Sequence, residues 1–213
     1  MNLDMNAIFT DDEKDILQEV MNIAFGNATA DLAGIIDIYV VLSIPNIQVI
    51  SIGSLPDYLR ETIDASNNTN IVDQKFWGDF SGSGFLVFPS GASDELMGFL
   101  EEQGPEESRK HKEIVESEVL TEIGNILIGA CVGKMSELLN TFVTYSPPRV
   151  IRGGSLEYNF LVDHFDPGQP AIVMKTVFKF KEKDINGFLM ILTNQDSIGW
   201  LRKSLQEFMG GYE

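Results

Sequence analysis

Two segments of this chain repeat a glutamate, an asparagine and a glycine at one spacing. Residues 15–36 read DILQEVMNIAFGNATADLAGII, and residues 118–139 read EVLTEIGNILIGACVGKMSELL. In each, the asparagine lies three residues after the glutamate, and the glycine lies four residues after the asparagine. Because an asparagine amide carries both a donor and an acceptor, it can hold a water molecule without taking its proton. Such a group suits phosphoryl transfer, in which positioning and electrostatics supply most of the catalysis.

The spacing places these side chains on one face of a helix. Steps of four, three and four residues, at about 100° per residue, give one polar ridge on each helix. The first ridge consists of Asp15, Glu19, Asn22 and Gly26, and the second of Glu118, Glu122, Asn125 and Gly129. Opposite each ridge runs an apolar stripe that must face a core. The stripes are Leu17, Val20, Met21, Ala24, Ala28 and Leu32 in the first helix, and Leu120, Ile123, Leu127, Cys131 and Met135 in the second.

Each ridge is either a site or an ordinary solvated helix face. Asparagine and glycine are poor residues in mid-helix, glycine by about 0.8–1.0 kcal/mol relative to alanine, yet both recur in register, which favours a site. The glycines have two interpretations of their own: they let another helix pack closely, or they leave room for the surface of a partner protein. A glutamate beside such a surface can bind a cation of the partner, such as a lysine.

The two segments belong to a longer internal repeat. A shift of 103 residues superimposes the two ridges and also aligns Pro45 with Pro148. The same shift aligns the Gly-Phe-Leu sequence at 84–86 with that at 187–189, without an insertion. A constant offset over this span predicts an internal duplication. We therefore expect one domain, residues 1–213, made of two repeats, residues 1–106 and 107–213.

The hydrophobic periodicity predicts a similar order of elements in both repeats. In the first we expect a helix at 11–36, opened by a capping box of Thr10 and Glu13, strands at 37–43, 46–52, 74–80 and 83–88, and a helix at 92–103. In the second we expect a helix at 108–139, strands at 141–145, 149–153, 157–163, 171–181 and 186–192, and a helix at 195–208. Strands with one wetter face favour an antiparallel sheet covered by helices on one side. The expected fold class is α+β, with the long motif helices packed on that sheet.

Composition narrows the classes of partner and of site. The formal net charge of −17 opposes binding to a phosphate backbone, so we expect protein or cationic partners and no nucleic acid. The chain has no run of eighteen apolar residues and no secretory signal, so we expect a cytoplasmic protein without a membrane segment. Cys131, the only cysteine, falls on an apolar stripe and is expected to be buried rather than nucleophilic. The only histidines, His111 and His164, lie in charged surroundings and are expected at the surface, so no metal site is predicted.

The paired segments resemble the D/S-x-x-x-E-x-x-N motif of the CheC, CheX and FliY family of chemotaxis phosphatases, which dephosphorylate the response regulator CheY. The resemblance covers nearly the whole chain, including the duplication and the sequence GNATADLA at 26–33. Two motifs on two helices indicate the CheC branch, because CheX-like members carry one. The resemblance implies a CheC-like fold with pseudo-twofold symmetry, in which the motif helices lie together over an antiparallel sheet.

Roles for the ridge residues follow from the resemblance by position. It implies that Asn22 and Asn125 orient the in-line water at the phosphoaspartate of the regulator, and that Glu19 and Glu122 bind the regulator's active-site lysine. The remaining ridge residues are expected at the partner surface: Asp15, Gly26, Glu118 and Gly129. The Mg²⁺ of this chemistry is held by the regulator, so this chain is expected to bind no cofactor or metal. The deamidase CheD is a further candidate partner.

The two copies of the motif differ in and beside the ridge. The differing pairs are Asp15 against Glu118, Met21 against Gly124, and Phe25 against Ile128. A bulky Met or Phe would alter how closely a receiver domain settles, whereas a glycine would leave the neighbourhood open. We therefore expect unequal sites, with the second the faster.

Two active functions stay open, besides a duplicated domain that has lost its activity. The first is a phosphatase of a phosphorylated response regulator. The second is a non-catalytic adaptor that binds the phosphorylated receiver, or CheD, through the same ridges. The asparagine in both copies favours the enzyme, since docking alone does not require an amide at that turn. Because the chain ends soon after its last expected helix, we also expect a free protein without the flagellar-switch domain that FliY carries.

Overall fold

The computed structural model describes residues 8–36, 39–62, 69–88, 92, 109–152, 170–180, 185–193 and 195–210. Two expected elements lie outside these residues: the strand at 157–163 and, except for Ala92, the helix at 92–103. The expected exposure of the His111 and His164 side chains also lies outside what the structure describes.

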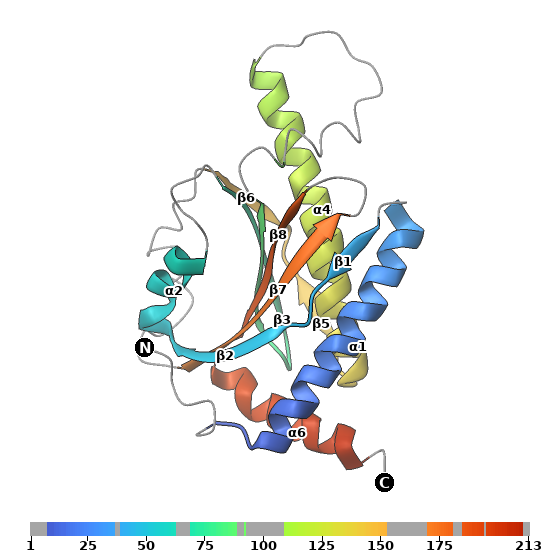
Figure 1. Cartoon of the computed structure of the whole chain (residues 1–213), viewed down its shortest axis with the longest axis vertical. Coiled ribbons are helices and arrows are strands. Elements are labelled where there is room, and N and C mark those ends of the chain that lie inside the picture. The colour runs from blue at the N-terminus through green and yellow to red at the C-terminus, as the bar shows by residue number, and fades with distance from the viewer. Residues whose placement is uncertain are drawn as a thin grey trace.

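The described residues form four α-helices and eight strands, labelled as in Figure 1. The helices are α1 (Asp11–Ile36), α2 (Leu55–Thr62), α4 (Arg109–Leu138) and α6 (Gln195–Gly210). The strands are β1 (Val40–Leu42), β2 (Asn46–Ser51), β3 (Asn70–Gly78), β4 (Gly82–Phe88), β5 (Val143–Tyr145), β6 (Arg149–Arg152), β7 (Pro170–Phe180) and β8 (Asn186–Thr193). Both long helices match their predicted ranges to within one residue, whereas the sequence does not predict α2.

All eight strands belong to one antiparallel sheet. Its order is β1-β7-β8-β4-β3-β5, with β2 also beside β7 and β6 also beside β3. Exchanging β1 with β5, β2 with β6, β7 with β3 and β8 with β4 gives the same order read from the other edge. The sheet therefore has a pseudo-twofold symmetry. At its centre Leu86 lies opposite Leu189, and these two leucines are 103 residues apart. The expected α+β class and antiparallel sheet are confirmed.

The edge strands of each half pair with the other half. Strands β1 and β2, from the first half of the chain, lie along β7, whereas β5 and β6, from the second half, lie along β3. Pro45 lies between β1 and β2, and Pro147 and Pro148 lie between β5 and β6. Each edge of the sheet is therefore two short strands interrupted by proline, which has no N–H to donate.

The offset of 103 residues does not hold throughout the sheet. Gly84 lies opposite Gln74 in the first half, whereas Gly187 lies opposite Phe178 in the second. The glycines are 103 residues apart, but Gln74 and Phe178 are 104 apart. Residues directly opposite each other in two paired strands point to the same face of the sheet. Gln74 and Phe178 therefore both lie on the helix-covered face, although they are one residue away from the offset of 103. The expected alignment without an insertion is therefore wrong in this strand.

Three helices cover one face of the sheet, and α2 lies against the other (Figure 1). Helices α1 and α4 lie side by side and run in opposite directions. The larger core, between these helices, α6 and the sheet, includes Val20, Leu127 and Leu201. A smaller core includes Leu55 of α2 and Phe85 of β4. The expected covering of one side holds for the three longer helices.

The segment Ile114–Leu138 of α4 is long and apolar enough to cross a membrane by length and composition alone. Half of its window is buried inside the protein, where α4 packs against α1 and the sheet. Core packing therefore accounts for its apolar composition.

Local signals fix the ends of the helices that carry the ridges. At the start of α1, Thr10 N–H donates to Glu13 Oε2 at 2.9 Å, and Glu13 N–H donates to Thr10 Oγ1 at 3.1 Å. This is the predicted capping box. At the end of α4, Asn140 takes a positive φ of 51°, and Thr141 N–H donates to the Ser136 carbonyl at 2.9 Å. The helix thus ends in a Schellman motif, whose left-handed residue is an asparagine.

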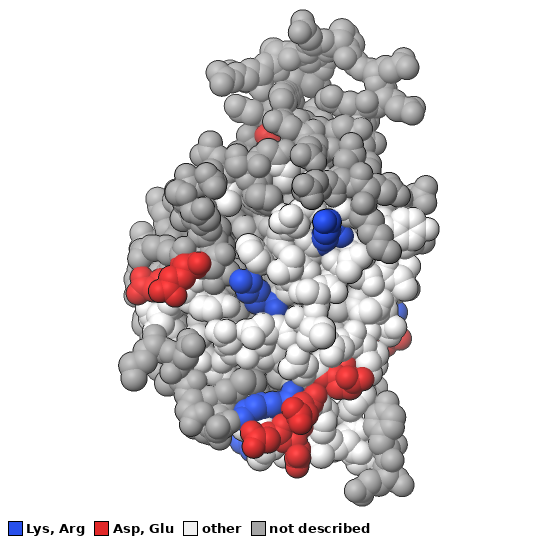
Figure 2. Space-filling view, in the orientation of Figure 1, with Lys and Arg blue, Asp and Glu red and all other residues white. Residues whose placement is uncertain are grey.

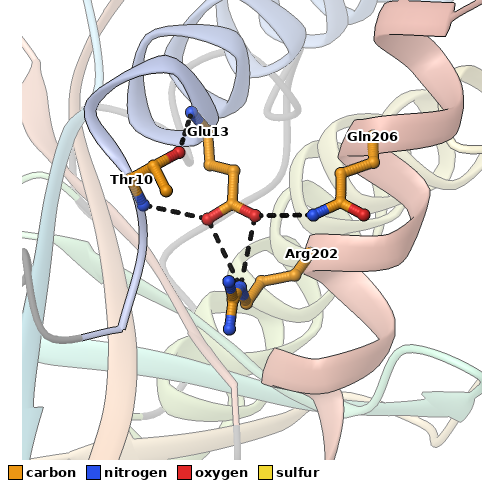
Figure 3. Close-up of polar contacts among 4 residues, drawn as sticks. All are labelled: Thr10, Glu13, Arg202 and Gln206. Carbon is orange, nitrogen blue, oxygen red and sulfur yellow. Dashed lines mark hydrogen bonds and ion pairs between the residues drawn. The ribbon is translucent and has the colours of Figure 1, made fainter.

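Glu13 also ties α1 to α6 (Figure 3). Its carboxylate accepts hydrogen bonds from Arg202 Nε at 3.2 Å and from Gln206 Nε2 at 3.0 Å. Burial by itself raises the pKa of Glu13, but the hydrogen bonds from Thr10, Gln206 and Arg202 outweigh it and hold the pKa below its usual range. The start of the helix that carries the first ridge is therefore anchored on α6.

Candidate functional site

Both ridges lie on the outside of the helix layer. The exposed members are Asp15, Glu19, Gly26, Glu118, Glu122 and Asn125. Asn22 and Gly129 are half-buried. Each ridge thus occupies an accessible helix face, as the spacing predicts, and the side-by-side packing of α1 and α4 puts both on the same side of the sheet. Among the described residues, no hydrogen bond or ion pair joins one ridge to the other.

The apolar stripes opposite the ridges are buried, as predicted. Their described members are Leu17, Val20, Met21, Ala24, Ala28, Leu120, Ile123, Leu127, Cys131 and Met135; the side chain of Leu32 lies outside the described set. Cys131 is fully buried, and burial raises the pKa of its thiol. A buried thiol that holds its proton is a core residue rather than a nucleophile, which confirms the prediction.

The two ridge glycines have open space beside them. A Cβ atom built on Gly26 or Gly129 would meet nothing within 4 Å beyond the nearby backbone of its own helix. Neither glycine is therefore required for another helix to pack closely, so the packing interpretation is wrong. The second interpretation, in which each glycine leaves room for the surface of a partner, stays a prediction.

The residues beside the motifs do not distinguish the ridges in the predicted way. Met21, Phe25 and Ile128 are at most 2% exposed, and Gly124 is buried against Val72 of β3. None of these side chains can contact a protein that docks on the ridges. Gly124 instead lets α4 approach the sheet, because a Cβ there would overlap the Val72 side chain. The predicted steric reason for unequal sites is therefore wrong, whereas the difference between Asp15 and Glu118 lies on exposed residues and stays a prediction.

Acidic side chains surround the first ridge. Figure 2 shows them gathered over the first half of α1. The exposed carboxylates of this stretch belong to Asp11, Asp12, Asp15 and Glu19. Lys14 lies among them and pairs with Asp11 at 2.8 Å. Carboxylates gathered on one surface attract a cationic group, as a lysine of a partner would supply.

Asn125 is held by a residue that the sequence motifs do not include. Gln74 on β3 is buried, and its Nε2 donates to Asn125 Oδ1 at 2.8 Å and to the Ser146 carbonyl at 3.1 Å. Asn22 makes no hydrogen bond to any described residue. One sequence signal could have found Gln74: it is a polar residue between two apolar ones on the same face of a strand. The predicted strand begins at residue 74 and therefore omits Val72, one of the two apolar neighbours in this alternation.

A known family and a curated relative match the sequence. The model of the CheC-like family matches residues 115–152, which contain the second ridge and strands β5 and β6. The CheY-P phosphatase CheC of Bacillus subtilis (strain 168) is 24% identical over 195 residues, which are 88% of this chain and 90% of the relative. The similarity to this relative therefore extends over both halves of the chain.

The fold is also similar to known structures. Thermotoga maritima FliY matches with a TM-score of 0.68 and 20% identity, over 94% of this chain and 99% of that chain. A chain in the FliG–FliM complex from H. pylori matches with a TM-score of 0.56 and 14% identity, over 89% of this chain and 98% of that chain. At these identities the likeness shows a common fold.

Proposed function

Because this chain belongs to the CheC/CheX/FliY family, we propose that it is a phosphatase acting on the phosphoaspartate of a CheY-type response regulator. One observation carries the proposal: a glutamate and an asparagine, one helical turn apart, occupy the accessible face of both α1 and α4. The relative from Bacillus subtilis, matched over most of both chains, is named a CheY-P phosphatase. We place the reaction in the cytoplasm.

In this proposal, Asn22 and Asn125 orient the attacking water. The water oxygen forms a new bond to phosphorus while the bond from phosphorus to the aspartate oxygen breaks, giving inorganic phosphate and a free carboxylate. The amide positions the water in line with the breaking bond and takes no proton itself. Both protons of the water leave on the phosphate product, as H2PO4⁻.

Glu19 and Glu122 bind the active-site lysine of the regulator. Their exposure leaves both carboxylates accessible to a docked protein. The rest of each ridge forms the partner surface: Asp15, Gly26, Glu118 and Gly129. The Mg²⁺ of the reaction is proposed to lie on the regulator, so the ridges supply no metal ligand.

Phosphate loss from a purified phosphorylated receiver, measured with and without this protein, tests the proposal. We expect the wild type to accelerate it and the double variant Asn22→Ala/Asn125→Ala to have no effect, because the amides act in the transition state. The double variant should still bind the receiver. Asn27→Ala, an exposed asparagine on α1 outside the ridge, is the matched control and should keep full activity. A double variant that retains most of the rate contradicts the mechanism.

The second candidate function is a non-catalytic adaptor that binds the phosphorylated receiver, or the deamidase CheD, through the ridges. The observation that favours it is the fold shared with a chain of the FliG–FliM complex. The same assay separates the two functions, because an adaptor binds the phosphorylated receiver without shortening its lifetime. Co-elution with purified CheD in size-exclusion chromatography tests the other partner.

A further inference from the structure

A buried glutamine lies beneath the second ridge and connects the sheet to Asn125. Gln74 is 2% exposed. Its Nε2 donates one hydrogen bond to Asn125 Oδ1, at 2.8 Å, and one to the Ser146 carbonyl, at 3.1 Å. These two bonds use both N–H groups of the glutamine amide.

The bond to Ser146 fixes the orientation of both amides. A backbone carbonyl can only accept a hydrogen bond, so the Gln74 atom that faces it must be the nitrogen. The Asn125 atom that lies 2.8 Å from that nitrogen must then be its acceptor, Oδ1. The Nδ2 group of Asn125 therefore does not face Gln74. It stays available to a water molecule, together with the second lone pair of Oδ1.

The first ridge has no such support. The carbonyl of Ser43, at the equivalent sequence position to that of Ser146, accepts its hydrogen bond from Thr176 Oγ1 at 2.6 Å. Phe178 lies opposite Gly187, as Gln74 lies opposite Gly84 in the other half of the sheet. Neither Thr176 nor Phe178 bonds Asn22, which has no hydrogen-bond partner in the described part of the chain.

Gln74 is an unfavourable residue for its place in the core. Its Oε1 is buried and has no hydrogen-bond partner among the described residues, and a buried acceptor left unpaired destabilises the folded state. An apolar side chain, such as Phe178 in the other half, avoids that loss. The bond to the Ser146 carbonyl offsets part of that loss, and the bond to Asn125 gives the second N–H group of the glutamine its use.

We propose that Gln74 is a positioning residue for the second site, where it holds Oδ1 of Asn125 and so fixes the amide that receives the attacking water. The inference rests on the proposed phosphatase function. It makes the second site preorganised, whereas no hydrogen bond from the described residues fixes the amide of Asn22 before a receiver docks. An amide that is already fixed loses less freedom on the way to the transition state, so Gln74 acts on kcat rather than on receiver affinity.

The experiment isolates the second site with Asn22→Ala and then adds Gln74→Met, which keeps a similar length and removes the amide. We expect kcat for phosphate release to fall roughly tenfold and KM to stay within about twofold. The melting temperature should stay close to that of the Asn22→Ala parent, because removal of the unpaired acceptor offsets loss of the bond to the Ser146 carbonyl. The side-chain amide signals of Asn125 should shift in a ¹⁵N–¹H spectrum. If Gln74→Met does not fold, Gln74→Leu takes its place.

Thr176→Val in an Asn125→Ala background is the matched control, because it removes the equivalent bond to Ser43. It should leave the kcat of the first site unchanged, and a comparable fall there would overturn the inference. An unchanged kcat after Gln74→Met, in a parent that does hydrolyse the phosphoaspartate, overturns the inference and leaves the proposed function intact. A fall in kcat accompanied by a lower melting temperature also overturns it, since that result marks a structural role. A wild type without activity overturns the proposed function and the inference with it.

Discussion

The ridge glutamates are exposed carboxylates on a chain whose net charge is already −17. Their position on the ridges, rather than their charge, must therefore distinguish them from the other carboxylates of the chain. Each is proposed to meet the lysine of a regulator. Reversing both charges, with Glu19→Lys and Glu122→Lys, should raise the Kd for the phosphorylated receiver roughly tenfold or more, because like charges then face each other. A titration of receiver into each protein measures the change.

The control for this prediction is a second pair of charge reversals on the other face of the sheet. Asp57→Lys with Glu61→Lys, both exposed on α2, changes the net charge by the same amount. Its Kd should stay near the wild-type value. Equal weakening by the two pairs would assign the effect to overall charge and leave the ridge glutamates on a solvated helix face.

The ridge glycines should show a conflict between stability and docking. Gly26→Ala and Gly129→Ala should each raise the free energy of unfolding by about 0.8–1.0 kcal/mol, because the added methyl meets no neighbour within 4 Å. The same methyl should weaken receiver binding, since it occupies the space left for the partner. Urea denaturation and a binding titration measure the two effects. Gly199→Ala on α6, which also has open space, should stabilise the protein without changing the Kd; if the ridge variants behave in the same way, docking lies elsewhere.

At the scale of elements, the polar cluster of Glu13 joins the first turn of α1 to α6. The pKa of Glu13 is lowered, so its contribution to stability is present above its unfolded-state pKa and is lost as the pH falls through the lower folded-state value. Glu13→Gln should reduce the free energy of unfolding by about 1 kcal/mol at neutral pH, because the amide oxygen can still accept from Thr10 N–H but the charge that pairs with Arg202 is lost. The difference from the wild type should shrink as the pH falls below the usual range of a glutamate.

Urea denaturation at a series of pH values tests this prediction. Glu207→Gln on α6 is the control, because its pair with Lys203 is exposed, at 3.6 Å, and such pairs contribute little. Its effect should be small and nearly independent of pH. A Glu13→Gln difference that stayed constant down to pH 3 would mean that the carboxylate charge does not hold the two helices together.

The elements differ in how far their own sequence determines them. The start of α1 could be predicted because a capping box is a local signal. Strand β3 begins at Asn70, four residues before its predicted start. Two of its first four residues, Asn70 and Asp73, are polar, and both are buried with distant partners: Asn70 bonds Glu116, and Asp73 bonds Arg149. Helix α2 does carry a local signal, because Leu55, Tyr58 and Leu59 in its sequence LPDYLRET recur at helical spacing, but its eight residues hold only about two turns of that pattern.

The candidate site divides in the same way. The ridges and their exposure follow from helical spacing, which is a property of each segment alone. The support beneath Asn125 does not, because Gln74 is 51 residues away in the sequence and meets it only through the sheet. The prediction that Met21 and Gly124 affect docking is wrong for a related reason: which neighbours of a ridge are buried depends on how α1 and α4 pack on the strands.

For the molecule as a whole, two ridges predict two sites that work independently and unequally. Each ridge carries its own glutamate and asparagine on one helix, so a single asparagine change should leave partial activity. Because Gln74 holds only Asn125, Asn125→Ala should cost more of the rate than Asn22→Ala. Rates with saturating phosphorylated receiver measure the difference. Two equal half-rates would contradict the inequality, and complete loss from either single change would contradict the independence.

The exchange of edge strands between the halves has a consequence on the ribosome. Val40 of β1 pairs with Phe180 of β7, so the first edge strand is made about 140 residues before its partner. At roughly 5–20 residues per second, this is a wait on the order of ten seconds. An unpaired strand can meanwhile join extended segments of other nascent chains. The three-residue length of β1 and the proline at position 45 leave such segments few consecutive hydrogen bonds to form, so the short edge protects the protein against aggregation while it is still being synthesised.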